Sequence, residues 1–272
     1  MTHIDTNEAL AVQRSISSDA AMQPKRVLIM TSVEAEREAV LRGLRHSSTS
    51  AAATKLEPQA ESVSSQPECT ETNHTVSLPQ LHFDVVLAGV GSAAAAVHTT
   101  RALLASPMPY DLVINAGIAG GFKGRAEIGT LVVASEIICA DLGAESEEGF
   151  ISIDKLGFGS AYAAAAKPYS AHLAKALGEA QLSAVHASIL TLSTVTGTRE
   201  SAEELLARFP EAAAEAMEGF GVAAAAEAAN VPVIELRAIS NPIGPRDRSA
   251  WRIGDALRAL EAACVVLKEV CA

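Results

Sequence analysis

The chain has 272 residues, 49% of them hydrophobic and 19% charged, which allows a sizeable core and excludes global disorder. Its 32 Asp and Glu residues outnumber 21 Lys and Arg residues, and the resulting net charge of −11 argues against binding to nucleic acid or to an anionic membrane surface. No apolar run approaches the roughly 18–20 residues that span a bilayer, and scattered cysteines without a Cys-x-x-Cys pair predict reduced thiols in a cytoplasmic globular protein.

The first part of the chain alternates between polar and structured segments. Residues 1–24 mix polar and small side chains without a sustained period, and they predict a disordered N-terminal tail. An apolar run at Arg26–Val33 predicts a strand, and Glu34–Arg45 predicts a helix. Ser, Thr, Pro and Glu dominate the stretch at about 46–80, which buries too little apolar surface to offset its ordering entropy and predicts a disordered insertion. We therefore expect a single domain over residues 25–272.

Beyond this insertion, short apolar runs take turns with helical stretches. We expect strands at Phe83–Val90, Asp111–Ile118, Gly129–Ala134, Val185–Leu192 and Val231–Ser240. We expect helices at Ser92–Ala105, Pro168–Gln181, Arg199–Phe209, Glu218–Ala229 and Ser249–Val270. The strands are apolar nearly throughout, as in sheets that helices cover on both faces. The alternation predicts a three-layer α/β fold, in which ligands bind beyond the carboxyl ends of the strands.

Two glycine-rich segments follow predicted strands. Gly89–Ala94 fits the G-x-G-x-x-(G/A) pattern of dinucleotide-binding turns, but no acidic residue ends the next strand to hold a ribose, so a tight turn is the better interpretation. The second segment, Asn115–Gly121, includes Gly117, Ala119 and Gly120. Small residues there keep the floor of a cleft low, so that a flat ligand can lie against the backbone. A tight loop without a ligand is an equally good interpretation of this segment alone.

Several carboxylates lie where predicted strands give way to helices. Glu34 and Glu36 come directly after the first strand, and Glu218 opens a predicted helix. For each residue alone, the preference of acidic side chains for the N-terminus of a helix is a sufficient explanation. Because ligands bind where strands end at one edge of the sheet, the convergence of carboxylates there indicates activation of water or binding of sugar hydroxyls.

The last predicted strand is followed by side chains suited to a base and to an anion. Asn241 offers an amide donor and a carbonyl acceptor to a base edge. Arg246, Arg248 and Trp251 come just beyond it, although solvated arginines are the simpler interpretation of either cation alone. The His and Cys spacings predict no metal site, and the lack of a P-loop and of a G-x-S-x-G turn argues against those chemistries.

Four segments, taken in order, resemble the nucleoside phosphorylase/hydrolase family and, within it, the methylthioadenosine/S-adenosylhomocysteine nucleosidases. They are VLIMTSVEAE (Val27–Glu36), LAGVGSAAAA (Leu87–Ala96), VINAGIAGGFKGRAEIGTLVVA (Val113–Ala134) and the stretch from AMEGFGVA to RAISN (Ala216–Asn241). The resemblance implies a three-layer α/β/α sandwich around a central mixed β-sheet. It also implies cleavage of the N-glycosidic bond of a purine nucleoside without a cofactor or metal, in a homodimer or a higher homo-oligomer.

By position, the resemblance implies roles for individual residues. Glu36 would orient and deprotonate the attacking water. Glu218 would hold the ribose hydroxyls, with Met217 packed against the sugar. The backbone at Thr196 and Gly197 would hold the purine. Together these residues predict an enzyme rather than a binding module.

A departure from the family pattern at Asn241 points to the base, and the charges after the first strand point to the nucleophile. The nucleosidases carry an aspartate, which protonates adenine, at the position of Asn241. A 6-oxopurine presents acceptors at N7 and O6, so an amide donor fits it better, and a buried polar mismatch costs about 1–3 kcal/mol. The pattern therefore favours a hypoxanthine nucleoside. A phosphorylase needs cations for phosphate, whereas the loop after the first strand supplies Glu34 and Glu36, which favours water as the nucleophile.

The segment RAISNPIGPRDRSAW, Arg237–Trp251, is similar to that of family hydrolases in menaquinone biosynthesis, whose hypoxanthine nucleoside carries a benzoate-bearing tail. The similarity implies that Arg246 or Arg248 meets the carboxylate and that Trp251 lines the tail pocket. Three alternatives stay open. They are an adenine-releasing nucleosidase, a phosphate-dependent purine nucleoside phosphorylase, and a non-catalytic purine-binding module of the same fold class.

Overall fold

The computed structural model describes residues 25–46 and 74–272, and the expectations for residues 1–24 and 47–73 lie outside these ranges. Its strands are β1 (Arg26–Thr31), β2 (His74–Leu78), β3 (Leu81–Leu87), β4 (Leu112–Gly121), β5 (Leu131–Cys139), β6 (Gly143–Ser146), β7 (Gly149–Ser152), β8 (Tyr162–Ala163), β9 (Ala184–Thr191), β10 (Ala212–Ala216) and β11 (Val233–Pro242). Its helices are α1 (Glu34–Arg45), α2 (Ser92–Ala105), α3 (Ile153–Leu156), α4 (Lys167–Glu179), α5 (Arg199–Arg208), α6 (Gly219–Ala228) and α7 (Ile253–Cys271), with a 3-10 turn at Arg248–Ala250. No helix within the described ranges combines the length and apolarity needed to cross a membrane.

A mixed nine-stranded sheet forms the centre of the fold, in the order β10-β9-β5-β11-β4-β1-β3-β2 with β8 beside β5. Strand β10 also pairs with β4, so the strands between them close into a ring from which β1, β3 and β2 extend. Strands β3, β1, β4 and β11 are parallel neighbours, whereas β11 and β5 run antiparallel. Because parallel strands end at the same edge, the residues that follow β1, β4 and β11 come together there.

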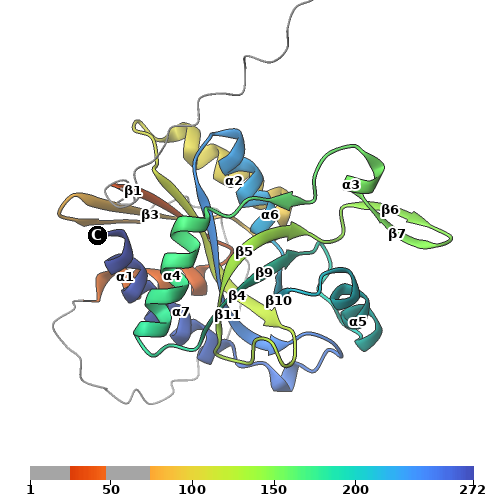
Figure 1. Ribbon diagram of the computed structural model, residues 1–272. Coiled ribbons are helices and arrows are strands. Elements are labelled where there is room, and N and C mark those ends of the chain that lie inside the picture. The colour runs from red at the N-terminus through yellow and green to blue at the C-terminus, as the bar shows by residue number, and fades with distance from the viewer. Residues whose placement is uncertain (1–24, 47–73) are drawn as a thin grey trace, which may run out of the picture.

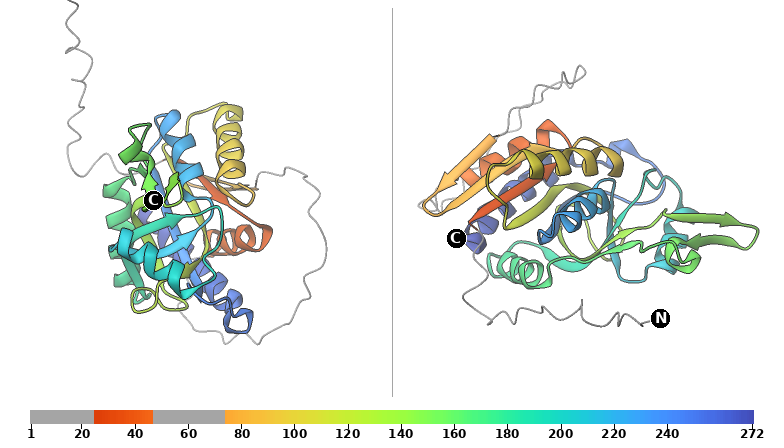
Figure 2. Two further views of the ribbon diagram at one scale, coloured as in Figure 1. Left: turned by 90° about the vertical axis from the view of Figure 1, so that its right-hand side faces the viewer. Right: turned by 90° about the horizontal axis from the view of Figure 1, so that it is seen from above.

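Helices cover both faces of this sheet (Figure 1). Helices α1, α4 and α7 lie on one face, and α2 and α6 lie on the other. The two turned views in Figure 2 show the same layers and the β6–β7 hairpin, which extends away from the main sheet. The structure therefore confirms the predicted three-layer arrangement around a mixed sheet.

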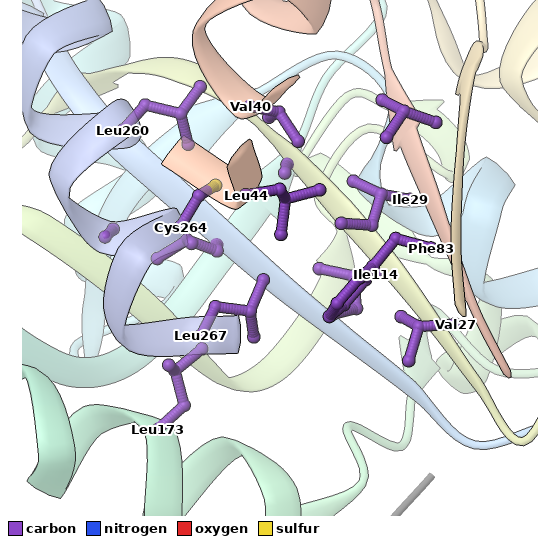
Figure 3. Packing of buried hydrophobic residues seen from close by; sticks show 14 of the residues in the cluster. Val27, Ile29, Val40, Leu44, Phe83, Ile114, Leu173, Leu260, Cys264 and Leu267 are labelled. Carbon is purple, nitrogen blue, oxygen red and sulfur yellow. The ribbon is translucent and has the colours of Figure 1, made fainter. Parts of the chain in front are cut away.

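The larger apolar cluster lies between the sheet and the helices α1, α4 and α7. In Figure 3, Leu44 of α1 lies between Leu260 and Leu267 of α7 on one side and Ile114 of β4 on the other, with Val40 near it. All five side chains are at most 1% exposed. Truncation of such a buried side chain to alanine typically costs about 2–5 kcal/mol, so this layer fixes α1, and with it the loop that follows β1.

The opposite layer is built from small residues. Helix α6 has the sequence GFGVAAAAEA, and Gly221 lies directly against the backbone carbonyl of Ser92 at the start of α2. A Cβ at Gly221 would collide with that carbonyl, so the close crossing of the two helices requires glycine. The crossing brings the N-terminal ends of α2 and α6 together, which places Gly91 beside Glu218.

The predicted alternation of strands and helices is confirmed, but several segments differ from the expectation, among them β6, β7, α3 and β8, which were not predicted. Residues 74–80 are not disordered, because β2 pairs with β3; its polar sequence buries only Val76, as an edge strand does. The glycine-rich segment Asn115–Gly121 is the end of strand β4 rather than a turn. Strand β10 was not predicted, since a run of alanines with one glutamate carries no strand pattern. Gly89 and Gly91 both have positive φ, as a tight turn requires.

Candidate active site

A cavity of about 350 Å³ lies where β1, β4, β10 and β11 end, a size within the range of small-molecule sites. It is lined by Ser32, Val33, Glu36, Val90, Ile118, Ala119, Gly120, Val195, Glu215, Ala216, Met217, Glu218, Ser240, Asn241 and Trp251. The structure thus gathers in one hollow seven residues that the sequence singled out, namely Glu36, Ala119, Gly120, Met217, Glu218, Asn241 and Trp251.

Glu36 stands in the first turn of α1 and is held by backbone groups. Its Oε2 accepts hydrogen bonds from the N–H groups of Ser32 at 2.8 Å and Val33 at 3.2 Å. Its Oε1 accepts from the N–H of Ile118 at 2.8 Å. Burial raises the pKa of Glu36 above its usual range, against the opposing effects of the Arg237 guanidinium and these N–H groups. A fixed carboxylate with a raised pKa is suited to accept a proton from water.

Arg237 lies fully buried beneath the cavity and joins the acidic side chains around it. Its Nη2 is 3.3 Å from Oε2 of Glu218, and its Nε donates to Oε1 of Glu235 at 2.8 Å. Glu218 also accepts a hydrogen bond from the N–H of Gly91 at 3.1 Å. A buried guanidinium offsets the cost of bringing several carboxylates out of water. The orientation of Glu218 is therefore set from two sides.

Gly117 lies so close to this cluster that there is no room for a side chain. A Cβ there would lie 2.6 Å from Nη1 of Arg237 and 2.6 Å from Oε1 of Glu36. Gly117 does not line the cavity. The predicted contact of Gly117 with a ligand stays a prediction. In the structure, the residue makes room for the close approach of Glu36 and Arg237.

Asn241 lies at a bulge near the end of β11. Ser240 Oγ donates to Oδ1 of Asn241 at 2.9 Å, and Nδ2 of Asn241 donates to the carbonyl of Pro242 at 3.1 Å. An amide has two N–H donors and a carbonyl oxygen with two lone pairs. One donor and one acceptor site thus stay available to a ligand in the cavity.

Glu215 is the charged residue of the cavity lining that the sequence analysis did not single out. It is 5% exposed, lines the cavity and accepts a hydrogen bond at Oε1 from the N–H of Thr196 at 2.8 Å. The available signal was a lone glutamate three residues before the Met217–Glu218 pair. Thr196 and Gly197 do not line the cavity themselves, although Val195 does. The Thr196 N–H is bonded to Glu215, and the contact of this backbone with a purine stays a prediction.

The predicted tail-binding residues lie at the rim. Trp251 lines the cavity, and the guanidinium of Arg246 lies 5.8 Å from the centre of its ring, a cation–π distance. Arg248 stands in the 3-10 turn, is exposed and does not line the cavity. Of the two arginines, the structure therefore places Arg246 nearer to the aromatic wall of the site.

The charges around the cavity are uneven. Three glutamates line it, and none of the lining residues is Lys, Arg or His. In the described parts of the chain, no three His, Cys, Asp or Glu side chains gather in a way that would hold a metal ion. The arrangement can orient water, bind hydroxyl groups and stabilise positive charge on a sugar ring.

Comparison with known proteins agrees with this fold and site. The model of the phosphorylase superfamily matches residues 49–271, and the chain belongs to that superfamily. It is similar to a futalosine hydrolase of Streptomyces coelicolor, with 52% identity over 181 residues that cover 65% of this chain and 75% of the relative. It is also similar to a futalosine hydrolase of Acidothermus cellulolyticus, with 44% identity over 240 residues that cover 88% of this chain and 89% of the relative.

Among solved structures, that of a futalosine hydrolase of Helicobacter pylori is similar in fold, with a TM-score of 0.71. The match covers 92% of this chain and 99% of that chain, at 17% sequence identity. Such a likeness concerns the fold. The match to the phosphorylase superfamily model confirms the family resemblance drawn from the four sequence segments.

Proposed function

We propose that this chain hydrolyses the N-glycosidic bond of futalosine, releasing hypoxanthine and dehypoxanthine futalosine in menaquinone biosynthesis. The observation that carries the proposal is one cavity in which Glu36, Glu218 and Asn241 meet and whose lining holds no cation. The identities of 52% and 44% to two futalosine hydrolases support the same substrate.

Glu36 acts on the attacking water. A carboxylate has about four lone-pair sites, and three of those on Glu36 are taken by backbone N–H groups. The remaining capacity serves to orient a water molecule and to accept its proton as the bond to the sugar carbon forms. A general base held in this way typically contributes about 10²–10⁴-fold to the rate.

Glu218 binds the ribose and steadies the charge that develops on it. Cleavage passes through an oxocarbenium-like sugar, so a negative carboxylate at the ring lowers the barrier. The N–H of Gly91 and the guanidinium of Arg237 fix the Glu218 carboxylate before the substrate arrives. Met217, which also lines the cavity, packs against the sugar.

Asn241 supports departure of the base. Its free amide N–H donates to the purine as negative charge grows on the leaving group. A 6-oxopurine can accept such a bond at O6 or N7 without full protonation, which fits the amide in place of an aspartate. Beyond the ribose, Trp251, which lines the cavity, would contact the aromatic part of the tail, and Arg246, 5.8 Å from the centre of its ring, would pair with the carboxylate.

The decisive experiment measures base release by chromatography from futalosine, aminodeoxyfutalosine, inosine and methylthioadenosine, with and without phosphate. We expect hypoxanthine release from futalosine to be fastest and independent of phosphate. Faster cleavage of the adenine nucleosides would instead identify an adenine-releasing nucleosidase. A requirement for phosphate would identify a phosphorylase, and purine binding without release from any substrate would identify a binding module.

We further propose a homodimer or a higher homo-oligomer, supported by an apolar surface on α2. Val97 and Leu104 are 64% and 81% exposed and border a hollow on this helix, and Val90, 58% exposed, connects it to the cavity lining. A second copy would cover this surface. Light scattering coupled to size exclusion tests the proposal; we expect at least twice the 28.1 kDa of one chain.

A cytoplasmic location is part of the same proposal. Cys139, Cys264 and Cys271 are free thiols, and burial raises the pKa of Cys264 and Cys271 to about 12. Such thiols are unreactive and suit a reducing compartment. Fractionation of cells that express the tagged chain tests this location.

A further inference from the structure

Glu215 occupies a position that the mechanism above does not use. In the pairing of β10 with β4, Glu215 stands opposite Gly120, and in the pairing of β11 with β4, Asn241 stands opposite the same glycine. Residues opposite one another on neighbouring strands project to the same face. The Glu215 Cγ and the Asn241 Nδ2 lie 3.6 Å and 3.5 Å from the point that a Cβ on Gly120 would occupy. Ile243 Cγ1 lies 2.8 Å from the same point, so the side chains of Glu215, Asn241 and Ile243 gather beside Gly120.

The Glu215 carboxylate has an unmet hydrogen bond. Its Oε1 accepts from the N–H of Thr196, whereas its Oε2 is buried and has no partner among the described residues. Burial raises the pKa of Glu215, and the contact to Thr196 opposes this only in part. A buried polar oxygen without a partner is costly and is retained where a ligand supplies the missing donor.

The edge of a 6-oxopurine carries such a donor next to its acceptor groups. Hypoxanthine presents N7 and O6 as acceptors, followed on the ring by N1–H as a donor. Adenine presents N7, then an amino donor, and then N1 as an acceptor. If the Asn241 amide donates to O6, the next group along the edge of hypoxanthine is N1–H, and an acceptor beside Asn241 must receive it.

We propose that Glu215 is a specificity-determining residue that accepts the N1 hydrogen of a 6-oxopurine and disfavours a 6-aminopurine, whose N1 lone pair would face a carboxylate oxygen. The inference rests on the proposed function and extends it, because it assigns base selection to two side chains. Asn241 and Glu215 read neighbouring positions of the same edge across Gly120.

The variant Glu215→Gln tests this assignment, since the backbone fixes how the amide sits. The Thr196 N–H requires an acceptor, so the glutamine carbonyl takes the place of Oε1 and the NH₂ group takes the place of the unpartnered Oε2. That NH₂ opposes N1–H of hypoxanthine but suits N1 of adenine. We expect kcat/KM for futalosine to fall roughly ten- to hundredfold and that for aminodeoxyfutalosine to stay constant or rise.

Glu211→Gln is the matched control, because Glu211 is exposed, directly precedes β10 and loses the same charge. We expect it to leave the ratio of the two kcat/KM values unchanged. An unchanged ratio in Glu215→Gln, or an equal loss on both substrates, would overturn the assignment in favour of a merely structural role.

Calorimetric titration with the free bases separates this inference from the proposed function. We expect Glu215→Gln to weaken the binding of hypoxanthine by the same factor and to leave adenine binding unaffected. Equal changes for both bases would count against Glu215. If the wild-type chain released no base from any nucleoside, the proposed function would fail, but the two dissociation constants would still decide whether Glu215 selects the base.

Discussion

The part of the cavity around Glu36 and Glu218, here called the reacting end after its proposed role, differs from the part around Glu215 and Asn241, here called the base end. The two differ in how completely their polar groups are hydrogen-bonded. At the reacting end, Glu36 is held by three backbone N–H groups, and Glu218 is held by an N–H group and a guanidinium. At the base end, Glu215 has an oxygen without a partner among the described residues, and Asn241 is bonded only to its chain neighbours. The first arrangement is preorganised for charge, as catalysis requires. The second leaves its hydrogen-bonding capacity to the ligand, as recognition requires.

The largest effect on the rate of base release is expected from a substitution at the reacting end. Glu36→Gln lowers hypoxanthine release at least about a hundredfold, because an amide cannot take a proton from water. Steady-state kinetics measures the loss, and circular dichroism checks that the chain is folded. The neighbouring Glu34→Gln is the control, since Glu34 is exposed and pairs with Arg37. Activity of Glu36→Gln within tenfold of the wild type would remove Glu36 from its assigned role.

A smaller effect, on the preference between two substrates, is expected from a substitution at the base end. Asn241→Asp introduces the residue that the nucleosidases carry, while the acceptor for Ser240 Oγ is retained. The donor to O6 of the base is lost, so we expect the preference for futalosine over aminodeoxyfutalosine to fall about tenfold. Competition assays with both substrates in one mixture measure this ratio directly. A ratio equal to that of the wild type would show that Asn241 does not select the base.

The unpaired base end also predicts a dependence of stability on pH. Burial raises the pKa of Glu215 in the folded chain above the ordinary value of 4.5. The folded state therefore binds the proton of the Glu215 carboxyl more tightly than the unfolded state does. The stability that this proton contributes to the fold is fully present below pH 4.5 and is lost as the pH rises through the raised pKa. At pH 8, we expect Glu215→Gln to have a larger free energy of unfolding in urea than the wild type. The expected gain is about 1.4 kcal/mol for each unit by which the pKa of Glu215 is raised.

The comparison that checks this prediction is urea unfolding at pH 5 and pH 8. The advantage of Glu215→Gln should shrink at the lower pH, where the wild-type carboxyl is closer to neutral. Glu36→Gln should gain less at pH 8, because both oxygens of Glu36 accept N–H groups and the glutamine NH₂ would oppose one of them. A constant difference for Glu215→Gln at both pH values would contradict the prediction.

The same contrast explains what the sequence alone could predict. Glu36, Glu218 and Asn241 follow clear strand or helix signals, and the rule that ligands bind at strand ends was enough to bring them together. The apolar strands and amphipathic helices were likewise visible, because long periodic patterns are the strongest signal in a sequence.

Other features depended on contacts far apart in the chain. Glu215 lies in β10, whose alanines have no strand preference and which forms a strand only because it pairs with β9 and β4. Glu235 and Arg237 both lie within β11, in a run that was predicted as a plain buried strand. The pairing of Arg237 with both Glu235 and Glu218 was not evident, since the folded ring of strands brings these charges into contact.

The smallest effect is expected at the rim, outside both ends. Removing two exposed guanidinium groups in an Arg246→Ala, Arg248→Ala variant should raise KM for futalosine about two- to fivefold at low salt with little change in kcat, the scale of an exposed ion pair. Because exposed charges are screened over about 10 Å at 0.1 M salt, the difference from the wild type should shrink as salt is added. Inosine, which lacks the carboxylate, is the control substrate and should show no change in KM. An unchanged KM for futalosine at low salt would separate the rim from tail recognition and leave selection of the substrate to the base end alone.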